Sequence, residues 1–564
     1  RVVQMEQNGG AYVARNHGLR LAQGEFVTLQ DADDWSHPLR IETQVRHLQQ
    51  HEALVGVTVA QGRATSELEF IKWAGSGGSV KIVKENVSSM MFRREPVIER
   101  VGGWDQVRFG ADSEMRSRLR HAFGKDAIAT IPHALLAFQR VSSNSAIADS
   151  DFGYEGFFFG ARLEYLQGQL WHHREQASSR FSPEGRETNF PVPVVMRPDR
   201  KSISNHYDVI VASEFRMHGG STRSNVEEMI AQKRAGLRTG VVQLFRYDFD
   251  ATQRRHMLPE ARAVLDAESC VPIVSGEKVT CDLLILRYPP ILQHKLRYLP
   301  KIDANKINVI VNQPPMSDYT EDGVVRYDLD RAAQHIREYF GKDATWYPIG
   351  PLVRDAMLNA HADQLPHIHL AEDNWYNIID IQGWARNGRR SVGGPKLRIG
   401  RHSRDHFAKW PDRREDILAA YPSAKDIEVH ILGGAKSAAA LIGKIPGNWT
   451  VHPFGALHPR DFLAQIDVFI YFAHPDWVES FGRTIIEAMA VGVPVILPPI
   501  YEPLFGTSAL YSSPQEAAAL ARALYADPEA YDRQVAHALD YARRHFSYDM
   551  HIDRVSRELV SRRG

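Results

Sequence analysis

Glu479 and Glu487 frame a stretch whose residue types suit a ligand that carries both hydroxyls and phosphates. A loop holds Glu479, Gly482 permits an unusual backbone at the end of that loop, and a helix is expected from Arg483. The free amides at a helix start bind a diphosphate, and a carboxylate is a good bidentate partner for vicinal hydroxyls such as those of ribose. One glutamate could therefore bind a sugar and the other a ribose, with the diphosphate between them. The alternative is an amphipathic helix that carries two surface glutamates.

Three carboxylates, Asp31, Asp33 and Asp34, follow a hydrophobic stretch over residues 25–30 that is typical of a strand. Ligands in open α/β sheets bind beyond the carboxyl ends of strands. Clustered carboxylates repel one another unless a cation or hydrogen-bond donors compensate, and a divalent metal ion, Mg2+ or Mn2+, bridging to a diphosphate would do so. The alternative is an aspartate-rich turn before the next helix, with Ser36 as its N-cap.

A third candidate is a glycine pair, Gly219 and Gly220, between an expected strand at 207–212 and an expected helix at 224–236. Two glycines in such a turn let backbone amides approach a phosphate or a sugar. A tight strand-to-helix turn explains the pair equally well.

The elements that must position these residues alternate between short apolar strands and amphipathic helices over nearly the whole chain. This alternation predicts an α/β protein built of mostly parallel sheets. Strands are expected over 25–30, 207–212, 282–287, 307–312, 427–432, 467–472 and 493–497, and helices over 10–22, 38–50, 224–236, 331–340, 413–420, 483–491, 515–526 and 529–545.

The composition is that of a large globular protein. The 564 residues hold 68 basic and 68 acidic side chains, so the net charge is zero, and 43% of the residues are hydrophobic. These values exclude a disordered chain and a strongly basic nucleic-acid coat, so no nucleic-acid partner is expected. The two cysteines, Cys270 and Cys281, exclude a disulfide scaffold, and the longest apolar runs are too short to span a membrane. The expected location is the cytoplasm, with peripheral contact at the inner face of the membrane left open.

Shifts in composition divide the chain into three blocks. A stretch rich in proline and serine over 176–206 is typical of a linker, and a second break is expected near residue 386. We therefore expect domains over 1–175, 207–385 and 386–546, followed by a C-terminal helix over 547–564.

Residues 8–19 (Asn-Gly-Gly-Ala-Tyr-Val-Ala-Arg-Asn-His-Gly-Leu) and 24–34 together closely resemble glycosyltransferase family 2, which has the GT-A fold. The resemblance implies that Asp31 and Asp33 bind the metal and the diphosphate of a nucleotide sugar. Residues 110–114 (Gly-Ala-Asp-Ser-Glu) resemble a second family element and place Asp112 at the general base. A carboxylate there takes the proton of the acceptor hydroxyl that attacks the anomeric carbon. The alternative is a helix start whose acidic residues suit the dipole.

The same resemblance sets an expectation for the start of the chain. In family 2, further strand–helix units precede the Asn-Gly-Gly stretch and hold the nucleotide base, whereas this chain begins just before that stretch. The first block is therefore expected to be a truncated, inverting and metal-dependent module that binds its donor poorly or not at all.

Residues 474–495, which contain Glu-Ser-Phe-Gly-Arg-Thr-Ile-Ile-Glu-Ala-Met-Ala, resemble glycosyltransferase family 4, whose GT-B fold carries two glutamates separated by seven residues. Residues 396–411 resemble the Gly-Arg…Lys segment of that family, and 431–434 resemble its glycine turn. The resemblance implies retaining, metal-independent transfer with catalytic roles for Arg401, Lys409 and Glu479; Arg404 is an alternative cation for the diphosphate. It places the donor on Gly219, Gly220, Gly433, Phe481, Gly482, Arg483, Thr484 and Glu487.

Together the two resemblances imply a glycosyltransferase in which a partial GT-A module precedes a GT-B module of two facing Rossmann-like domains. The expected donor is a UDP- or GDP-sugar, and the expected acceptor is a saccharide or a lipid-linked molecule in the synthesis of a bacterial surface polysaccharide. Two alternatives stay open. Either only the GT-B module is active and the first block is a docking domain, or the chain is a non-catalytic carbohydrate-binding scaffold.

Overall fold

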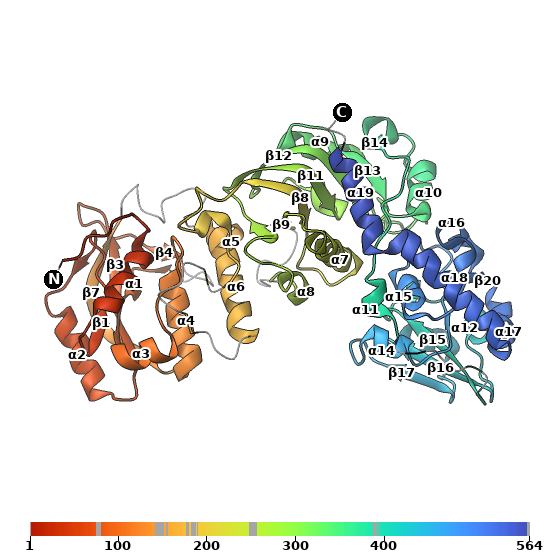
Figure 1. Cartoon of the computed structure of the whole chain (residues 1–564), viewed down its shortest axis with the longest axis horizontal. Helices are drawn as coiled ribbons and strands as arrows, with labels where there is room; N and C mark the ends of the chain where they lie inside the picture. The colour runs from red at the N-terminus through yellow and green to blue at the C-terminus, as the bar shows by residue number, and fades with distance from the viewer. Residues whose placement is uncertain are drawn as a thin grey trace.

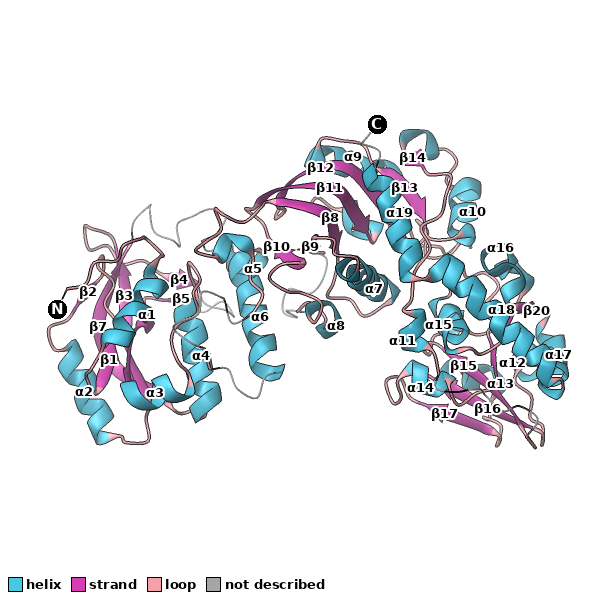
Figure 2. Cartoon of the chain, in the orientation of Figure 1, coloured by secondary structure: helices cyan, strands magenta, loops and turns pink. Residues whose placement is uncertain are grey.

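The computed structural model describes residues 2–560 except 75–79, 142–151, 154–155, 176–179, 182–187, 189, 247–255, 387, 389–391 and 393. Three sheets of five or more strands follow one another along the chain, and helices flank each of them (Figures 1 and 2). The expected α/β class is confirmed. Within the described ranges, no helix is both long and apolar enough to cross a lipid bilayer.

The first sheet is mixed, so the expectation of mostly parallel strands is wrong for this block. Its order is β1-β6-β3-β7-β2, in which β3 and β7 are parallel and the other neighbours are antiparallel. The strand β3 is buried along its length but ends in polar residues such as Gln61 and Arg63, so its sequence does not look like that of a core strand. The strands are β1 (Phe26–Thr28), β2 (Trp35–Ser36), β3 (Gly56–Ala64), β6 (Val83–Arg93) and β7 (Ile128–Arg140), with a small hairpin of β4 (Trp73–Ala74) and β5 (Val80–Lys81); the helices are α1 (Ala11–Leu21), α2 (Arg40–Gln50), α3 (Arg94–Arg100) and α4 (Ala111–Phe123).

The second sheet has seven strands in the order β10-β9-β8-β11-β12-β13-β14, and all of its pairs are parallel. Its central strands are buried on both faces, as the apolar runs at 209–212, 283–286 and 307–311 require. The strands are β8 (His206–Ser213), β9 (Thr239–Gln243), β10 (Cys270–Ile273), β11 (Lys278–Arg287), β12 (Lys301–Val311), β13 (Thr345–Pro348) and β14 (His369–Leu370); the helices include α7 (Gly220–Arg234), α8 (Pro259–Arg262), α9 (Leu329–Phe340), α10 (Pro351–Ala360) and α11 (Ile381–Trp384).

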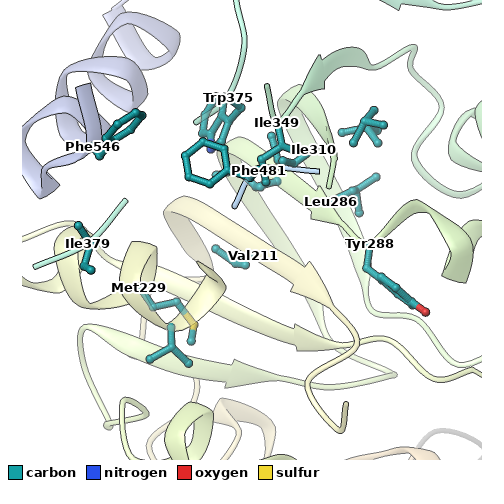
Figure 3. Packing of buried hydrophobic residues seen from close by; sticks show 14 of the residues in the cluster. Val211, Met229, Leu286, Tyr288, Ile310, Ile349, Trp375, Ile379, Phe481 and Phe546 are labelled. Carbon is teal, nitrogen blue, oxygen red and sulfur yellow. The ribbon is translucent and has the colours of Figure 1, made fainter. Parts of the chain in front are cut away.

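The third sheet has six parallel strands in the order β17-β16-β15-β18-β19-β20. One hydrophobic core runs from the second sheet into this domain: Phe481 lies beside Ile349 and Trp375 of the second domain and packs edge-on against Phe546 (Figure 3). The strands are β15 (Leu397–His402), β16 (Ile427–Leu432), β17 (Trp449–His452), β18 (Val468–Ile470), β19 (Val495–Leu497) and β20 (Leu510–Tyr511); the helices are α12 (Arg414–Ala420), α13 (Lys436–Ile442), α14 (Pro459–Leu463), α15 (Arg483–Val491), α16 (Glu502–Phe505), α17 (Pro514–Ala526), α18 (Pro528–Phe546) and α19 (Tyr548–Val560).

The last helix, α19, returns to the domain of the second sheet and packs on α7 and β11 (Figure 1). Its buried His551 lies 3.0 Å from the side-chain amide of Gln232, and Glu558 accepts a 3.0 Å hydrogen bond from the Tyr347 hydroxyl. The helix thus ties the second domain to the end of the third.

The helix α6 (Ala161–Glu175) joins the first module to the second domain, because it packs on both α4 and α8. Glu164 forms a buried bidentate ion pair with Arg262 of α8, at 2.7 and 2.9 Å. The described end of the expected 176–206 linker is not a free tether: Phe190, Val192 and Met196 belong to the core of the first module. Because that stretch is rich in charged residues and proline, its sequence does not indicate that these apolar residues are buried.

Candidate active site

A cleft of about 520 Å³ lies between the second and third domains, beyond the carboxyl ends of their parallel strands. The loop after β8, the loop after β15 and the loop and helix after β18 all line it. This is where open parallel sheets bind ligands. The predicted residues Gly219, Gly220, Gly433, Lys409, Glu479, Phe481, Gly482, Arg483, Thr484 and Glu487 are all brought together here.

Two glycines shape the floor of this cleft because their backbones are left-handed. Gly482, at φ 76°, is the N-cap of α15, and a Cβ on it would lie 2.6 Å from the side chain of Ile485. Gly433, at φ 112°, lies so close to the Ser403 carbonyl oxygen that a Cβ would be 1.9 Å from it. The chain therefore turns sharply at both points, and the N-terminal amides of α15 face the cleft.

Glu487 is almost completely buried and surrounded by cations. Its side chain is 1% exposed, one oxygen lies 2.7 Å from His402 Nε2, and the other accepts from Arg483 and Arg223 at 3.2 Å each. Burial alone would raise the pKa of Glu487, but the contacts with His402, Arg483 and Arg223 outweigh it and hold the pKa at about 2. Glu487 is thus an ionised acceptor over the whole physiological range.

Glu479 is held by two donors at the other end of the same wall. It forms an ion pair with Lys409 and accepts a 2.8 Å hydrogen bond from the Tyr471 hydroxyl. Burial opposes its ionisation, yet the Lys409 ammonium keeps the pKa of Glu479 below its ordinary value. The alternative of two surface glutamates is therefore wrong for both positions, since their side chains are 13% and 1% exposed.

The position of Arg401 differs from the sequence-based expectation that this side chain acts on the diphosphate. Its side chain is fully buried, does not line the cleft, and stacks on Trp410, Tyr421 and Tyr471 at 4.1, 5.8 and 4.8 Å from the ring centres. A guanidinium packs well on aromatic faces, and here it supports Tyr471, the residue that donates to Glu479. Arg401 is placed to position Glu479 through Tyr471, and it is not among the residues that line the cleft.

Arg404, the alternative cation, does line the cleft. Its side chain is exposed and makes no ion pair with the part of the chain that the structure describes. Lys409 lines the cleft too, but its charge is shared with Glu479. An exposed, uncompensated guanidinium beside helix amides is suited to bind a dianion.

Three other predicted residues, Gly219, Gly220 and Phe481, offer a ligand mainly their backbones. Gly219 is extended, at φ 167°, and a Cβ on Gly219 or Gly220 would meet no atom within 4 Å. The pair therefore leaves open space at the start of α7. The ring of Phe481 is 3% exposed and packs edge-on against Phe546, so only the rest of this residue is available to a ligand.

The predicted acidic site of the first module is built around an arginine that the sequence did not single out. Arg15 of α1 bonds Asp31 at 2.5 Å and Asp112 at 2.7 Å, and so brings together residues from two distant elements. The Tyr12 hydroxyl donates to Asp112 at 3.1 Å. Burial raises the pKa of Asp112 while Arg15 opposes that rise, and a raised pKa suits a general base.

Asp33 and Asp34 are neighbours in the chain but differ in their exposure to solvent. Asp33 is exposed, whereas Asp34 accepts a hydrogen bond from the Arg140 amide at 3.2 Å and burial raises its pKa to about 6. In the described ranges, no three Asp, Glu, His or Cys side chains gather as they do around a metal ion. The oxygen ligands that Mg2+ or Mn2+ prefers are present, but Asp31 is committed to Arg15, so the protein alone does not form a complete metal site.

Sequence reasoning missed Arg15, Arg223 and His402. Arg15 lies within the motif of 8–19, and His402 follows Arg401 directly, so both could have been found as polar neighbours of predicted residues. Arg223 is separated from its partner Glu487 by 264 positions, and no local pattern predicts that contact.

Two segments of the chain match models of known protein families. Residues 1–96 match the model of glycosyl transferase family 2, and residues 407–526 match that of the glycosyl transferases group 1. The first match contains Asp31 and Asp33, and the second contains Lys409, Glu479 and Glu487. Both resemblances drawn from the sequence are thereby confirmed.

Curated relatives match shorter stretches. A GDP-mannose-dependent alpha-mannosyltransferase of Mycolicibacterium smegmatis is 30% identical over 156 residues, which cover 25% of this chain and 37% of that protein. Glycosyltransferase GlyG of Streptococcus pneumoniae is 40% identical over 53 residues, covering 9% and 18%. The chain thus spans well under half the length of either curated relative.

Solved structures with a similar course of the chain include HepE of Anabaena, determined with UDP and glucose, and a glycosyltransferase of Rickettsia africae. HepE is 12% identical with a TM-score of 0.41 and is covered completely, against 63% of this chain. The Rickettsia protein is 13% identical with a TM-score of 0.43, covering 63% of this chain and 99% of that structure. The two family matches carry the comparison: residues 1–96 are similar to glycosyl transferase family 2, and residues 407–526 are similar to the glycosyl transferases group 1.

Proposed function

We propose that the cleft between the second and third domains transfers a sugar from a UDP- or GDP-sugar to a saccharide or lipid-linked acceptor. The observation that carries this proposal is the set of groups in one cavity: the amides of α15, the exposed Arg404, and the buried carboxylates Glu479 and Glu487. Such a set matches the phosphates and hydroxyls of a nucleotide sugar.

Each group has a role in this proposal. Glu487 accepts from the ribose hydroxyls, and the amides of α15 hold the diphosphate. Arg404 and Lys409 stabilise the negative charge that develops on the departing diphosphate, which is usually a large part of the catalytic effect. Glu479 orients the hydroxyls of the transferred sugar. No metal ion is needed, because protein cations supply the positive charge, and the anomeric configuration is retained.

A donor screen tests this function. Release of nucleoside diphosphate is measured from UDP- and GDP-hexoses, with and without EDTA, and for a Glu487→Gln variant. We expect release that survives EDTA and is lost in the variant. If no nucleotide sugar is turned over while saccharides still bind, the chain is a non-catalytic carbohydrate-binding scaffold.

A second candidate function is favoured by the acidic cluster of the first module. We propose that Asp112 acts as general base in an inverting transfer, with Asp31 and Asp33 binding Mg2+ or Mn2+ together with the donor diphosphate. The raised pKa of Asp112 supports the base role. Release of nucleoside diphosphate that EDTA abolishes and Asp112→Asn removes would assign activity to this module. If all release is insensitive to EDTA, the module acts as a docking domain.

The biological setting follows from the same proposal. The product is a bacterial surface polysaccharide or a lipid-linked precursor of one, made in the cytoplasm or at the inner face of the membrane. Partition of the protein between buffer and vesicles containing anionic lipid tests the membrane contact.

A further inference from the structure

Two helices from different domains meet at the cleft through a reciprocal set of ion pairs. On α7, Arg223 and Glu227 are one turn apart, and on α15 Arg483 and Glu487 are one turn apart. Arg223 bonds Glu487 at 3.2 Å, and Arg483 bonds Glu227 at 2.9 Å. Each arginine therefore reaches the carboxylate of the opposite helix.

The two arginines of this set are not equivalent. Arg483 is 10% exposed, is also bonded to Glu487 of its own helix, and lies deep between the domains. Arg223 is 40% exposed, lines the cleft, and follows the open loop of Gly219 and Gly220. Without Arg223, Glu487 would still be compensated by His402 and Arg483. Arg223 is thus the partner that Glu487 can lose and still remain paired.

The proposed function requires that Glu487 exchange one of its protein partners for the ribose. Both of its oxygens accept from protein donors in this structure, one from His402 and the other from Arg223 and Arg483. A ribose whose hydroxyls bind this carboxylate competes with Arg223, the only one of the three donors that belongs to the opposite domain and is substantially exposed.

We propose that Arg223 is a donor-binding residue that exchanges partners: it leaves Glu487 when the ribose binds there and bonds the diphosphate of the same donor. This inference rests on the proposed function of the cleft. The exchange keeps Arg223 paired with an anion in both states, and it lets the domain of the second sheet sense that the domain of the third sheet holds a nucleotide. The ligand class is a nucleoside diphosphate, free or carrying a sugar.

Because Arg223 opposes the ribose and attracts the diphosphate, its removal should change the two affinities in opposite directions. The experiment measures equilibrium binding of uridine, guanosine, UDP and GDP to the full chain and to Arg223→Ala. We expect the Kd of the better diphosphate to rise about 10- to 100-fold, the range for a charge-assisted hydrogen bond. The Kd of the matching nucleoside should stay the same or fall. Arg223→Lys, which keeps the charge, should recover part of the diphosphate affinity.

Arg234→Ala is a matched control on the same helix. Arg234 also bonds a carboxylate outside its own helix, Asp380 at the start of α11, at 2.9 Å, but both residues belong to the second domain and neither lines the cleft. This variant should leave the ratio of nucleoside to diphosphate affinity unchanged.

Three results would overturn the exchange. If Arg223→Ala weakens nucleoside and diphosphate equally, Arg223 acts only by holding the domains together. If it leaves both unchanged, Arg223 does not touch the donor. If the unmodified chain binds none of the four probes, the proposed function itself is wrong, and this outcome is distinct because it does not depend on the variant.

Discussion

The acidic site of the first module and the cleft between the other two domains are both built from carboxylates and cations, but the charge in excess has the opposite sign. In the first module Arg15 bridges Asp31 and Asp112, and two further aspartates, Asp33 and Asp34, lie two and three residues after Asp31. In the cleft the four cations Arg223, Arg404, Lys409 and Arg483 outnumber the three carboxylates Glu260, Glu479 and Glu487. The first site is short of positive charge, whereas the second has a surplus.

This difference predicts what each site binds. Carboxylates in excess need a cation, which an added metal ion can supply, whereas cations in excess with helix amides attract a diphosphate directly. The two sites also differ in enclosure, because the cleft is closed by two domains. A buried carboxylate such as Glu487 can then be held ionised by several neighbours at once, as its pKa of about 2 shows.

The strongest test of the comparison is to remove one carboxylate from each site. Glu487→Gln should lower the release of nucleoside diphosphate, measured below saturation, by about 10²- to 10³-fold, because the buried carboxylate that binds and orients the ribose of the nucleotide sugar is lost. Asp33→Asn should leave the EDTA-resistant part of that release unchanged. Steady-state kinetics of both variants check this. If Asp33→Asn were the more damaging change, the cleft would not be the main site.

A second test separates Arg401 of β15 from Arg404 of the loop that follows it. Arg404→Ala should lower kcat/KM about 10- to 100-fold with an unchanged melting temperature, since one charge-assisted bond to the diphosphate is lost. Arg401→Ala should instead cost about 2–4 kcal/mol of unfolding free energy, because it leaves a cavity among three aromatic rings. Kinetics and chemical denaturation distinguish them. A stable Arg401→Ala protein with strongly reduced activity would restore Arg401 to the diphosphate.

A third test asks whether the acidic site takes a metal ion. Mn2+ bound in the presence of UDP should be about tenfold weaker in Asp33→Asn, because one oxygen ligand of a hard cation is lost. Titration followed by the electron paramagnetic resonance of free Mn2+ measures this. Asp126→Asn, an exposed aspartate of the same module, serves as the control. Equal Mn2+ affinity in all three proteins would leave the acidic cluster as a turn held by Arg15.

The smallest expected effect concerns the joint between the two regions, which is the contact of the segment around Val195 with Glu277 of the second domain. Glu277 accepts the amides of Val195 and Val274 at 3.0 and 2.7 Å, and burial raises its pKa to about 7. A carboxyl whose folded pKa is raised favours folding in its protonated form, so its contribution is present at low pH and is lost as the pH rises through about 7. The unfolding free energy should therefore rise by about 1 kcal/mol from pH 8 to pH 6.

Glu277→Gln should remove that slope, because glutamine does not titrate. The exposed Glu268→Gln is the control and should keep it. Denaturant unfolding at several pH values provides the measurement. A slope that persists in Glu277→Gln would assign it to another group and would leave the joint insensitive to pH.

Local patterns predicted much of the second and third domains. Short apolar runs predict β8 and β16 within one residue and the C-terminal halves of β11 and β12, where these strands are buried on both faces; the polar first halves of β11 and β12 are missed. The stretch around Glu479 and Gly482 was assigned to a loop and helix start for physical reasons that the left-handed Gly482 bears out. The first sheet was harder to predict, because β3 buries polar residues that pattern reading assigns to the surface.

The sequence by itself determined the class of fold, the alternation of strands and helices in the second and third domains, and the residue types at both sites. These features depend on periodicity, glycine backbones and charge, which are properties of short segments. Only the tertiary structure decided which charges meet: Arg15 joins residues of distant elements, Arg223 reaches Glu487 across 264 positions, and Arg401 lies in an aromatic core while Arg404 faces the cleft. The reason is physical: whether a charged side chain binds a ligand or supports the fold depends on its burial and its partners, and both come from the packing of whole domains.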